Sequence, residues 1–247
     1  MAQAATVFDL PSRIGEYGSR GFYPVPDAAR LVGTSANLLR RWASVDLVKP
    51  TISTSGAELR TVNGYSFEDL FYLRVLNMLR HRVSLFEAAK TVSLITKRAG
   101  APGAQWSRLQ IKFINRKAWV YFPDQWGWTL AVDTGGTGQR GEERLLFPRA
   151  FRALSRRIDA LIVPQRYWHY IEVNPDVRDG FPVLLGTSFE TAVVKQLRDH
   201  GMSFAEMHTS FPSYSEMQLS MGYQFELYLD STRPHPKPST VPYRQPN

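Results

Sequence analysis

Five polar side chains between positions 34 and 41 have the chemistry needed to contact a nucleic acid: Thr34, Ser35, Asn37, Arg40 and Arg41. Hydroxyl groups bond to phosphate oxygens, an asparagine amide pairs with adenine, and a guanidinium pairs with guanine or with phosphate. The apolar residues among them recur at the spacing of a helix that faces a core. We therefore expect these five residues to share the outer face of one short helix.

That helix, predicted over 36–43, is the second of a pair. Pro26 suits the first position of the preceding helix, because its missing N–H has no partner there in any case. Ala29 is small enough to let the two helices cross closely, and Gly33 favours a left-handed turn between them. Thr34 or Ser35 then caps the second helix. Two short helices joined by a tight glycine turn are typical of a helix-turn-helix.

A two-stranded wing is predicted after this pair, because residues 51–64 are polar, β-prone and marked by glycine. Its arms cover 51–54 and 58–62, and Arg60 on the second arm is a further candidate for DNA contact. Ser66 with Asp69, and Ser84 with Glu87, then predict two capped helices that end near positions 81 and 97.

This order of parts resembles the MerR class of winged helix-turn-helix domains over residues 23–95. The resemblance is carried by several short segments: Pro26–Ala29, Leu39–Trp42, Val45–Pro50, Tyr65–Leu70 and His81–Glu87. It implies the DNA-binding fold. It does not imply the effector mechanism of that class, because the long dimerising helix and the metal-sensing cysteines are missing.

A β-hairpin or small meander is predicted over 108–132, followed by a glycine-rich loop at 133–141. The loop has neither P-loop nor dinucleotide-binding spacing, so a phosphate cradle is only its alternative interpretation. A basic helix is predicted over 147–162. Its four arginines are either a solvated face or a phosphate-binding one: Arg149, Arg152, Arg156 and Arg157.

Three helices are predicted in the last third, over 188–200, 204–210 and 214–229. Each begins with a capping pair, namely Thr187 with Glu190, Ser203 with Glu206, and Ser213 with Glu216. Together they form a trihelical unit.

This unit resembles, over Tyr170–Leu229, a small prokaryotic domain found in antitoxins of toxin–antitoxin pairs. The resemblance rests on four segments: Ile171–Pro175, Gly186-Thr187, Leu197–Phe204 and Phe211-Pro212. Together with the MerR-like head, the chain resembles a VapB-type antitoxin. That resemblance implies two partners, operator DNA and a VapC-type ribonuclease toxin whose clustered carboxylates bind Mg²⁺.

The segment 231–247 contains five prolines and no apolar period. Its side chains Arg233, Lys237, Tyr243 and Arg244 suit the acidic cleft of such a toxin. A passive, solvated terminus is the alternative interpretation.

Charge and composition favour two different partners. The net charge is +5 over residues 1–99, +6 over 100–170 and −3 over 171–247, so the basic part suits a polyanion. A solvated basic surface is the alternative interpretation, and the charge alone does not decide between them. We expect a cytoplasmic protein without a membrane span or secretory signal, and a homodimer or a hetero-oligomer with the toxin. The chain has no cysteine, its five histidines form no metal-binding pattern, and Asp124 and Asp133 carry no catalytic motif. We therefore expect no catalytic residues, no metal and no cofactor.

The sequence thus predicts an α+β protein with a flexible arm (1–22), a winged helix-turn-helix (23–100), a β-containing region with a basic helix (104–167), a trihelical unit (168–230) and a proline-rich tail (231–247). The expected function is an antitoxin that represses its own operator and neutralises a ribonuclease toxin. A stand-alone MerR-like transcriptional regulator is the alternative. A third hypothesis, DNA contact through the trihelical unit, is opposed by the charge of −3 on the last third.

Overall fold

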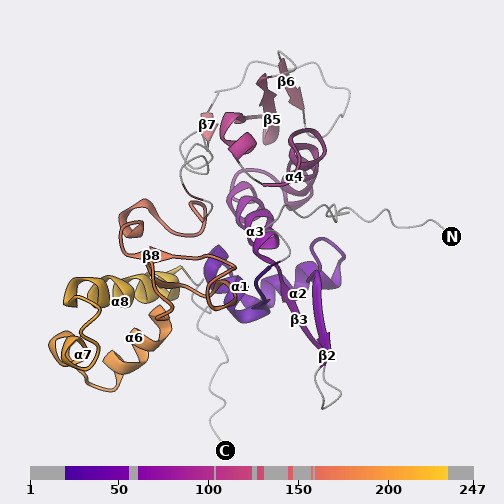
Figure 1. The fold of residues 1–247 in the computed structure, drawn as a ribbon. Helices are drawn as coiled ribbons and strands as arrows, with labels where there is room; N and C mark the ends of the chain where they lie inside the picture. The colour runs from indigo at the N-terminus through magenta and orange to yellow at the C-terminus, as the bar shows by residue number, and fades with distance from the viewer. Residues whose placement is uncertain are drawn as a thin grey trace, which may run out of the picture.

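A computed structural model describes residues 20–55, 61–102, 104–123, 127–130, 144–146, 157 and 159–232. These residues form seven α-helices and several small antiparallel sheets, which confirms the α+β class (Figure 1). None of the helices in the described part of the chain is long and apolar enough to cross a membrane.

Two short helices follow strand β1 (Tyr23–Pro24), namely α1 (Val25–Val32) and α2 (Ala36–Ser44). Pro26 lies in the first turn of α1, and Gly33 ends that helix in the left-handed conformation, with φ of 72°. The hydroxyl oxygen of Ser35 accepts a hydrogen bond from the backbone amide of Leu38 at 3.2 Å and so caps α2. The predicted helix pair and its glycine turn are confirmed.

A three-stranded antiparallel sheet lies beside this pair, in the order β1-β3-β2. Strands β2 (Ile52–Ser55) and β3 (Thr61–Tyr65) pair with Ser53 opposite Asn63, as a hairpin requires. The hairpin extends away from the helices (Figure 1). Positions 56–60, including Arg60, lie outside the described residues.

Helices α3 (Phe67–Leu79) and α4 (Leu85–Ala99) come next. Ser66 and Asp69 form the predicted capping box. At α4 only half of the prediction is right, because Ser84 accepts from the Glu87 amide at 3.1 Å while the Glu87 carboxylate is engaged elsewhere. That carboxylate accepts a hydrogen bond from the backbone amide of Ala118, in the next sheet, at 3.1 Å.

The middle of the chain forms a four-stranded antiparallel sheet in the order β6-β5-β4-β7. A 3-10 turn, η1 (Ala104–Arg108), precedes it, and its strands are β4 (Gln110–Ile114), β5 (Lys117–Phe122), β6 (Gly127–Leu130) and β7 (Arg144–Leu146). The first three strands in the sequence follow the predicted meander, whereas β7, which pairs with β4, was not predicted. The loop 133–141 and most of the predicted basic helix, including Arg149, Arg152 and Arg156, lie outside the described residues.

Arg157 does not lie on an open basic face. Its Nε and Nη2 atoms each donate to Asp159 at 2.6 Å, and its Nη2 also donates to the backbone oxygen of Ile171 at 2.7 Å. Asp159 is buried, and residues 159–162 form turns rather than helix. The prediction of a helix to position 162 with Arg157 on its basic face is therefore wrong, because Arg157 neutralises a buried carboxylate.

The last third contains a two-stranded sheet and three helices. The smaller elements are β8 (Ile171–Glu172), β9 (Val183–Leu184), η3 (Gln165–Tyr167) and η4 (Arg178–Gly180). The helices are α6 (Thr191–Asp199), α7 (Phe204–Ser210) and α8 (Glu216–Ser231), and α6 and α7 both contact α8. The predicted trihelical unit is present.

Only one of the three predicted capping pairs in this unit is right, that of Ser203 with Glu206. The Glu190 carboxylate pairs with Arg178 instead of capping α6. Helix α8 begins two residues later than predicted, with Ser215 and Gln218 as its capping box in place of Ser213 and Glu216.

A single hydrophobic core joins the first and last thirds of the chain. Tyr23 is fully buried, and its hydroxyl donates to the Gly180 backbone oxygen at 2.9 Å. The Phe22 amide donates to the Asp179 backbone oxygen at 3.3 Å, and Arg20 forms an ion pair with Asp176. Strand β1 is thus held between the helix pair and the C-terminal unit.

Candidate nucleic-acid interface

Helix α2 has an apolar face and a polar face, as the sequence predicts. Leu39 and Trp42 are buried, whereas Asn37, Arg40 and Arg41 are exposed. The Nη1 atom of Arg40 donates to the Asn37 side-chain oxygen at 3.0 Å, so these two side chains lie together on the surface. The three exposed residues have the donors and acceptors that contact base edges and phosphates.

Thr34 does not lie on this face, and the prediction that it points outward is wrong. Its side chain is 1% exposed. The reason is tertiary, because Asn77 of α3 donates to the backbone oxygens of Val32 and Gly33 at 3.1 and 3.0 Å and holds the turn against the core. Ser35 is half-buried and its hydroxyl oxygen caps α2, so its first role is structural.

A basic turn that the sequence interpretation missed contacts α2 through Arg80. Arg80, His81 and Arg82 join α3 to α4, and the last two are exposed. The Arg80 guanidinium lies 5.7 Å from the centre of the Trp42 ring, which connects the turn to α2. Partial burial and the two neighbouring arginines lower the pKa of His81, so the positive charge of this turn at neutral pH belongs to the arginines. The signal in the sequence was three consecutive basic residues between two helices.

One more basic residue, Lys49, lies near this surface, and the remaining predicted contact residues lie outside the described part of the chain. Lys49, before the hairpin, is exposed but forms an ion pair with Asp46 at 2.8 Å. Arg60 lies outside the described residues. So do the four residues predicted to contact a toxin: Arg233, Lys237, Tyr243 and Arg244.

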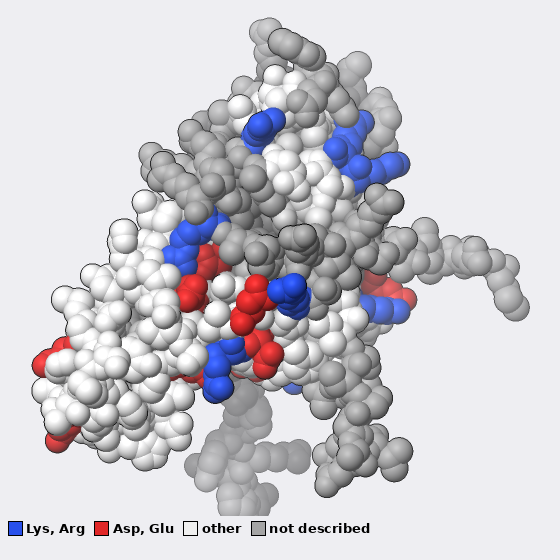
Figure 2. All heavy atoms as spheres, in the orientation of Figure 1, with Lys and Arg blue, Asp and Glu red and all other residues white. Residues whose placement is uncertain are grey.

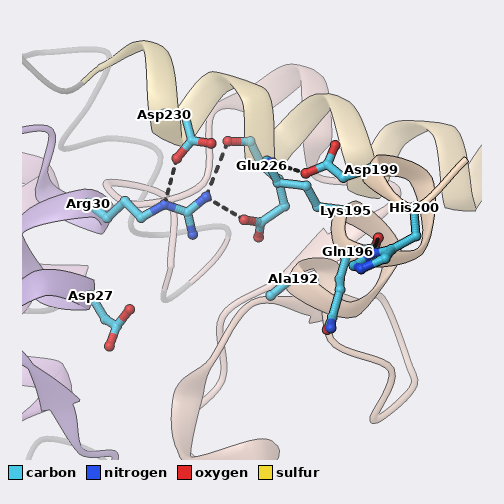
Figure 3. Close-up of a pocket in the computed structure, with 9 residues that line it drawn as sticks. All are labelled: Asp27, Arg30, Ala192, Lys195, Gln196, Asp199, His200, Glu226 and Asp230. Atoms are coloured by element: carbon cyan, nitrogen blue, oxygen red, sulfur yellow. Dashed lines mark hydrogen bonds and ion pairs between the residues drawn. The ribbon is translucent and has the colours of Figure 1, made fainter. Parts of the chain in front are cut away.

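A second charged region lies between α1 and the helices α6 and α8 (Figure 3). It is a cleft of about 430 Å³ whose charged lining includes Asp27, Arg30, Lys195, Asp199, Glu226 and Asp230. Figure 3 shows Arg30 reaching from α1 to two carboxylates of α8. Its Nη2 atom lies 2.5 Å from Glu226 Oε2, and its Nε atom lies 2.9 Å from Asp230 Oδ1.

This ion pair is unequally buried. The Glu226 side chain is 1% exposed and Arg30 is 17% exposed, whereas Asp230 is 38% exposed. Burial alone would lower the pKa of Arg30, but the attraction and hydrogen bonds of Glu226 and Asp230 outweigh it and raise that pKa. The second oxygen of Glu226 accepts from the hydroxyl of Thr191, at the start of α6. The cluster therefore joins α1, α6 and α8 through one buried carboxylate.

Comparison of the chain with models of known protein families, with curated protein sequences and with solved structures finds no match. What the protein binds is therefore inferred from its own side chains.

Proposed function

We propose that this protein binds double-stranded DNA through α2, with a winged helix-turn-helix head of the MerR type. The observation that carries the proposal is the division of α2 into a buried apolar face and an exposed face that bears Asn37, Arg40 and Arg41. An α-helix with its side chains is about 10–12 Å across, which matches the roughly 12 Å width of the major groove.

The elements around α2 suit the same role. The β2–β3 hairpin lies beside the helix pair, where a wing contacts the neighbouring phosphates. Arg80 adds one guanidinium group beside the Trp42 ring of α2, and Arg82 is exposed in the same turn. In this arrangement Arg40 and Arg41 contact bases or phosphates, and the basic turn binds the backbone.

Fluorescence anisotropy with a duplex that spans the promoter of the protein's own gene tests the proposal. Arg40→Gln or Arg41→Gln should weaken binding by about 1–3 kcal/mol where the residue contacts a base. A phosphate contact would instead lower the slope of log K against log salt by about 0.9. Lys97→Gln is the matched control, because it removes one exposed positive charge from α4, away from α2. Unchanged affinity and salt slope in both arginine variants would exclude α2 as the reading helix.

We propose further that the protein is an antitoxin whose C-terminal unit binds a VapC-type ribonuclease, the DNA-binding head serving as autorepressor. The three-helix arrangement of α6, α7 and α8 supports this proposal, together with the net negative charge of the last third. Expression of the neighbouring reading frame alone and together with this protein tests it. Growth arrest rescued by co-expression, with a complex that co-purifies, is the expected result. A harmless neighbour and no complex would leave the stand-alone regulator as the function.

A further inference from the structure

Two side chains at the end of α3, Asn77 and Arg80, hold α2 near both of its ends. Asn77 is buried in a helix whose other buried side chains are mostly apolar. A buried amide is costly unless its donors and its acceptor are bonded. The Nδ2 atom of Asn77 donates to the backbone oxygens of Val32 and Gly33 at 3.1 and 3.0 Å. Its Oδ1 atom accepts from Arg80 Nε at 2.7 Å, so the whole amide is used.

The turn before α2 needs these donors because α1 ends there. The last carbonyl groups of a helix have no partner within it. The Gly33 amide bonds back into α1, but the carbonyl groups of Val32 and Gly33 are bonded by side chains of α3. Arg74 Nη1 adds a bond to the Val32 oxygen at 2.9 Å, and a Cβ at Gly33 would lie 2.8 Å from the same Nη1 atom. Helix α3 thus fixes the backbone from which α2 begins.

Arg80 acts near the other end of α2. Its guanidinium lies 5.7 Å from the centre of the Trp42 ring, within the range of a cation–π contact. Trp42 is buried, and its Nε1 atom has no hydrogen-bond partner in the described part of the chain. The ring is therefore held by packing and by Arg80. Because Asn77 bonds Arg80 Nε, the contacts at the two ends of α2 are connected.

Two fixed points set the direction of a short helix. Ser35 and Trp42 are seven residues apart, which is about 10 Å along the helix axis. A tilt of about 10° about the turn would move the far end of α2 by about 2 Å, whereas a preorganised contact tolerates about 0.5 Å. Accurate placement of the exposed side chains of α2 therefore depends on both points.

Surface charge does not supply this direction on the face that Figure 2 draws. Blue and red side chains are mixed over the middle of the molecule, and the coloured residues there, which are those that the structure describes, form no broad area of one sign. Attraction to phosphates therefore does not align a duplex across that part of the surface. The alignment has to come from how α2 is held.

We propose that Asn77 and Arg80 are positioning residues that set the direction of α2 and hence its sequence selectivity, an inference that rests on the proposed function. Without them α2 tilts, and its side chains no longer reach the same base edges. Phosphate contacts carry no sequence information, so selectivity falls more than affinity for any duplex. Arg80 acts through its planar geometry as well as its charge, and the exposed Arg82 is the residue of this turn that suits phosphates.

The ratio of two dissociation constants tests this role, one for the promoter duplex and one for a scrambled duplex of the same length and composition. Asn77→Leu keeps a similar shape without donors, and Arg80→Lys keeps the charge without the planar fork. Each should reduce selectivity about 10-fold, the effect of about one lost base contact. Neither variant changes the net charge, so the dependence of binding on salt should stay that of the wild type.

The matched control is Thr91→Val, in the same head of the protein. Thr91 is fully buried, and its hydroxyl donates to the Glu87 backbone oxygen within α4 at 2.7 Å. The variant therefore loses a buried hydrogen bond, as Asn77→Leu does, without touching the turn or Trp42. It should lower stability and leave the selectivity ratio unchanged.

Hydrogen exchange of the free protein gives a second measurement that does not need DNA. The amides of Leu38 and Leu39 bond to the Ser35 oxygen at 3.0 and 3.1 Å. They should exchange several-fold faster in Asn77→Leu and Arg80→Lys than in the wild type, while the amides of α4 keep their rates. Thr91→Val should show the opposite pattern.

Positioning by Asn77 and Arg80 is refuted if both variants keep the selectivity of the wild type, or if Thr91→Val loses as much. It is also refuted if Arg80→Lys behaves like the wild type and only Arg80→Gln is impaired, because the charge alone would then matter. A wild type that binds both duplexes equally would instead refute the proposed function. In that case the exchange rates decide alone, and unchanged rates in α2 would refute the positioning role as well.

Discussion

Replacing Arg30 by methionine should be among the most destabilising single changes at the junction between α1 and α8. The change removes the guanidinium that neutralises Glu226, whose side chain is 1% exposed. Removing one partner of a buried ion pair costs about 3–5 kcal/mol, because the remaining charge stays buried without compensation. The Thr191 hydroxyl still donates to Glu226 in the variant, so we expect a loss near the lower end of that range.

The losses of stability expected for the other variants follow from how exposed each carboxylate is. Glu226→Gln leaves Arg30 with Asp230 at 2.9 Å and keeps an oxygen for Thr191, so it should cost about 2 kcal/mol, less than a fully uncompensated charge. Asp230→Asn affects a carboxylate that is 38% exposed, so its cost should stay below about 1 kcal/mol. The double variant Arg30→Met, Glu226→Met removes both buried charges and should recover most of the loss.

Urea unfolding followed by far-UV circular dichroism measures these differences. The control is Lys195→Met, which breaks an exposed pair with Asp199 within α6 and should cost about 0.3–0.5 kcal/mol. Thermal unfolding should agree, with Arg30→Met lowering Tm by roughly 2–4 °C per kcal/mol. If Arg30→Met costs no more than Lys195→Met, or if the double variant loses the sum of both single losses, the buried pair does not hold the junction.

Four further predictions concern single groups. Tyr65 is fully buried and its hydroxyl has no hydrogen-bond partner in the described part of the chain, so Tyr65→Phe should raise the free energy of unfolding by about 1 kcal/mol. Tyr72→Phe, which removes a 2.8 Å hydrogen bond to a buried carboxylate, should lower it in the same denaturation assay. Ser215 caps α8, so Ser215→Ala should lower the free energy of unfolding by about 1 kcal/mol, whereas Ser213→Ala should leave it unchanged. If thermal melts show the larger loss for Ser213→Ala, α8 begins at the earlier position that the sequence predicted. Burial outweighs the hydrogen bonds of Asp69 and raises its pKa, so its charge opposes folding as the pH rises above about 4. Asp69→Asn should therefore be more stable than the wild type between about pH 4 and pH 7 and differ little from it near pH 3. Urea midpoints of both proteins measured across this pH range test the prediction. A difference between them that does not change with pH would contradict this reasoning.

The sequence predicts this fold best where the decisive contacts are local. Ser66 and Ser203 cap their helices through residues three positions away, and both caps are confirmed. The start of α8 shows the limit of that signal, because Ser213 and Ser215 each precede an acceptor by three residues. Only packing against the rest of the unit decides between them.

The predictions failed where a distant group competes for a side chain. Glu87 binds the Ala118 amide, 31 residues away, in place of its own helix start. Thr34 is buried because Asn77 anchors the turn beside it. The contact of Arg30 with Glu226 spans 196 residues, and no local pattern in the sequence announces it.

The junction also limits how the two ends of the chain can influence one another. Helix α1 contacts both α2 and α8, and Arg30 lies three residues before the Gly33 turn that aims α2. A ligand couples to DNA binding only if its contacts differ between two states of the protein. Met217 and Leu227 are exposed on α8. A partner that covers these two residues leaves the contacts of Arg30 unchanged. Its binding therefore does not distinguish two states of the junction and does not couple to DNA binding by this route. A partner that draws Glu226 or Asp230 away from Arg30 changes the support of α1 and hence the position of α2. Coupling between a C-terminal partner and the DNA-reading helix through this junction therefore depends on the cleft between α1 and α8.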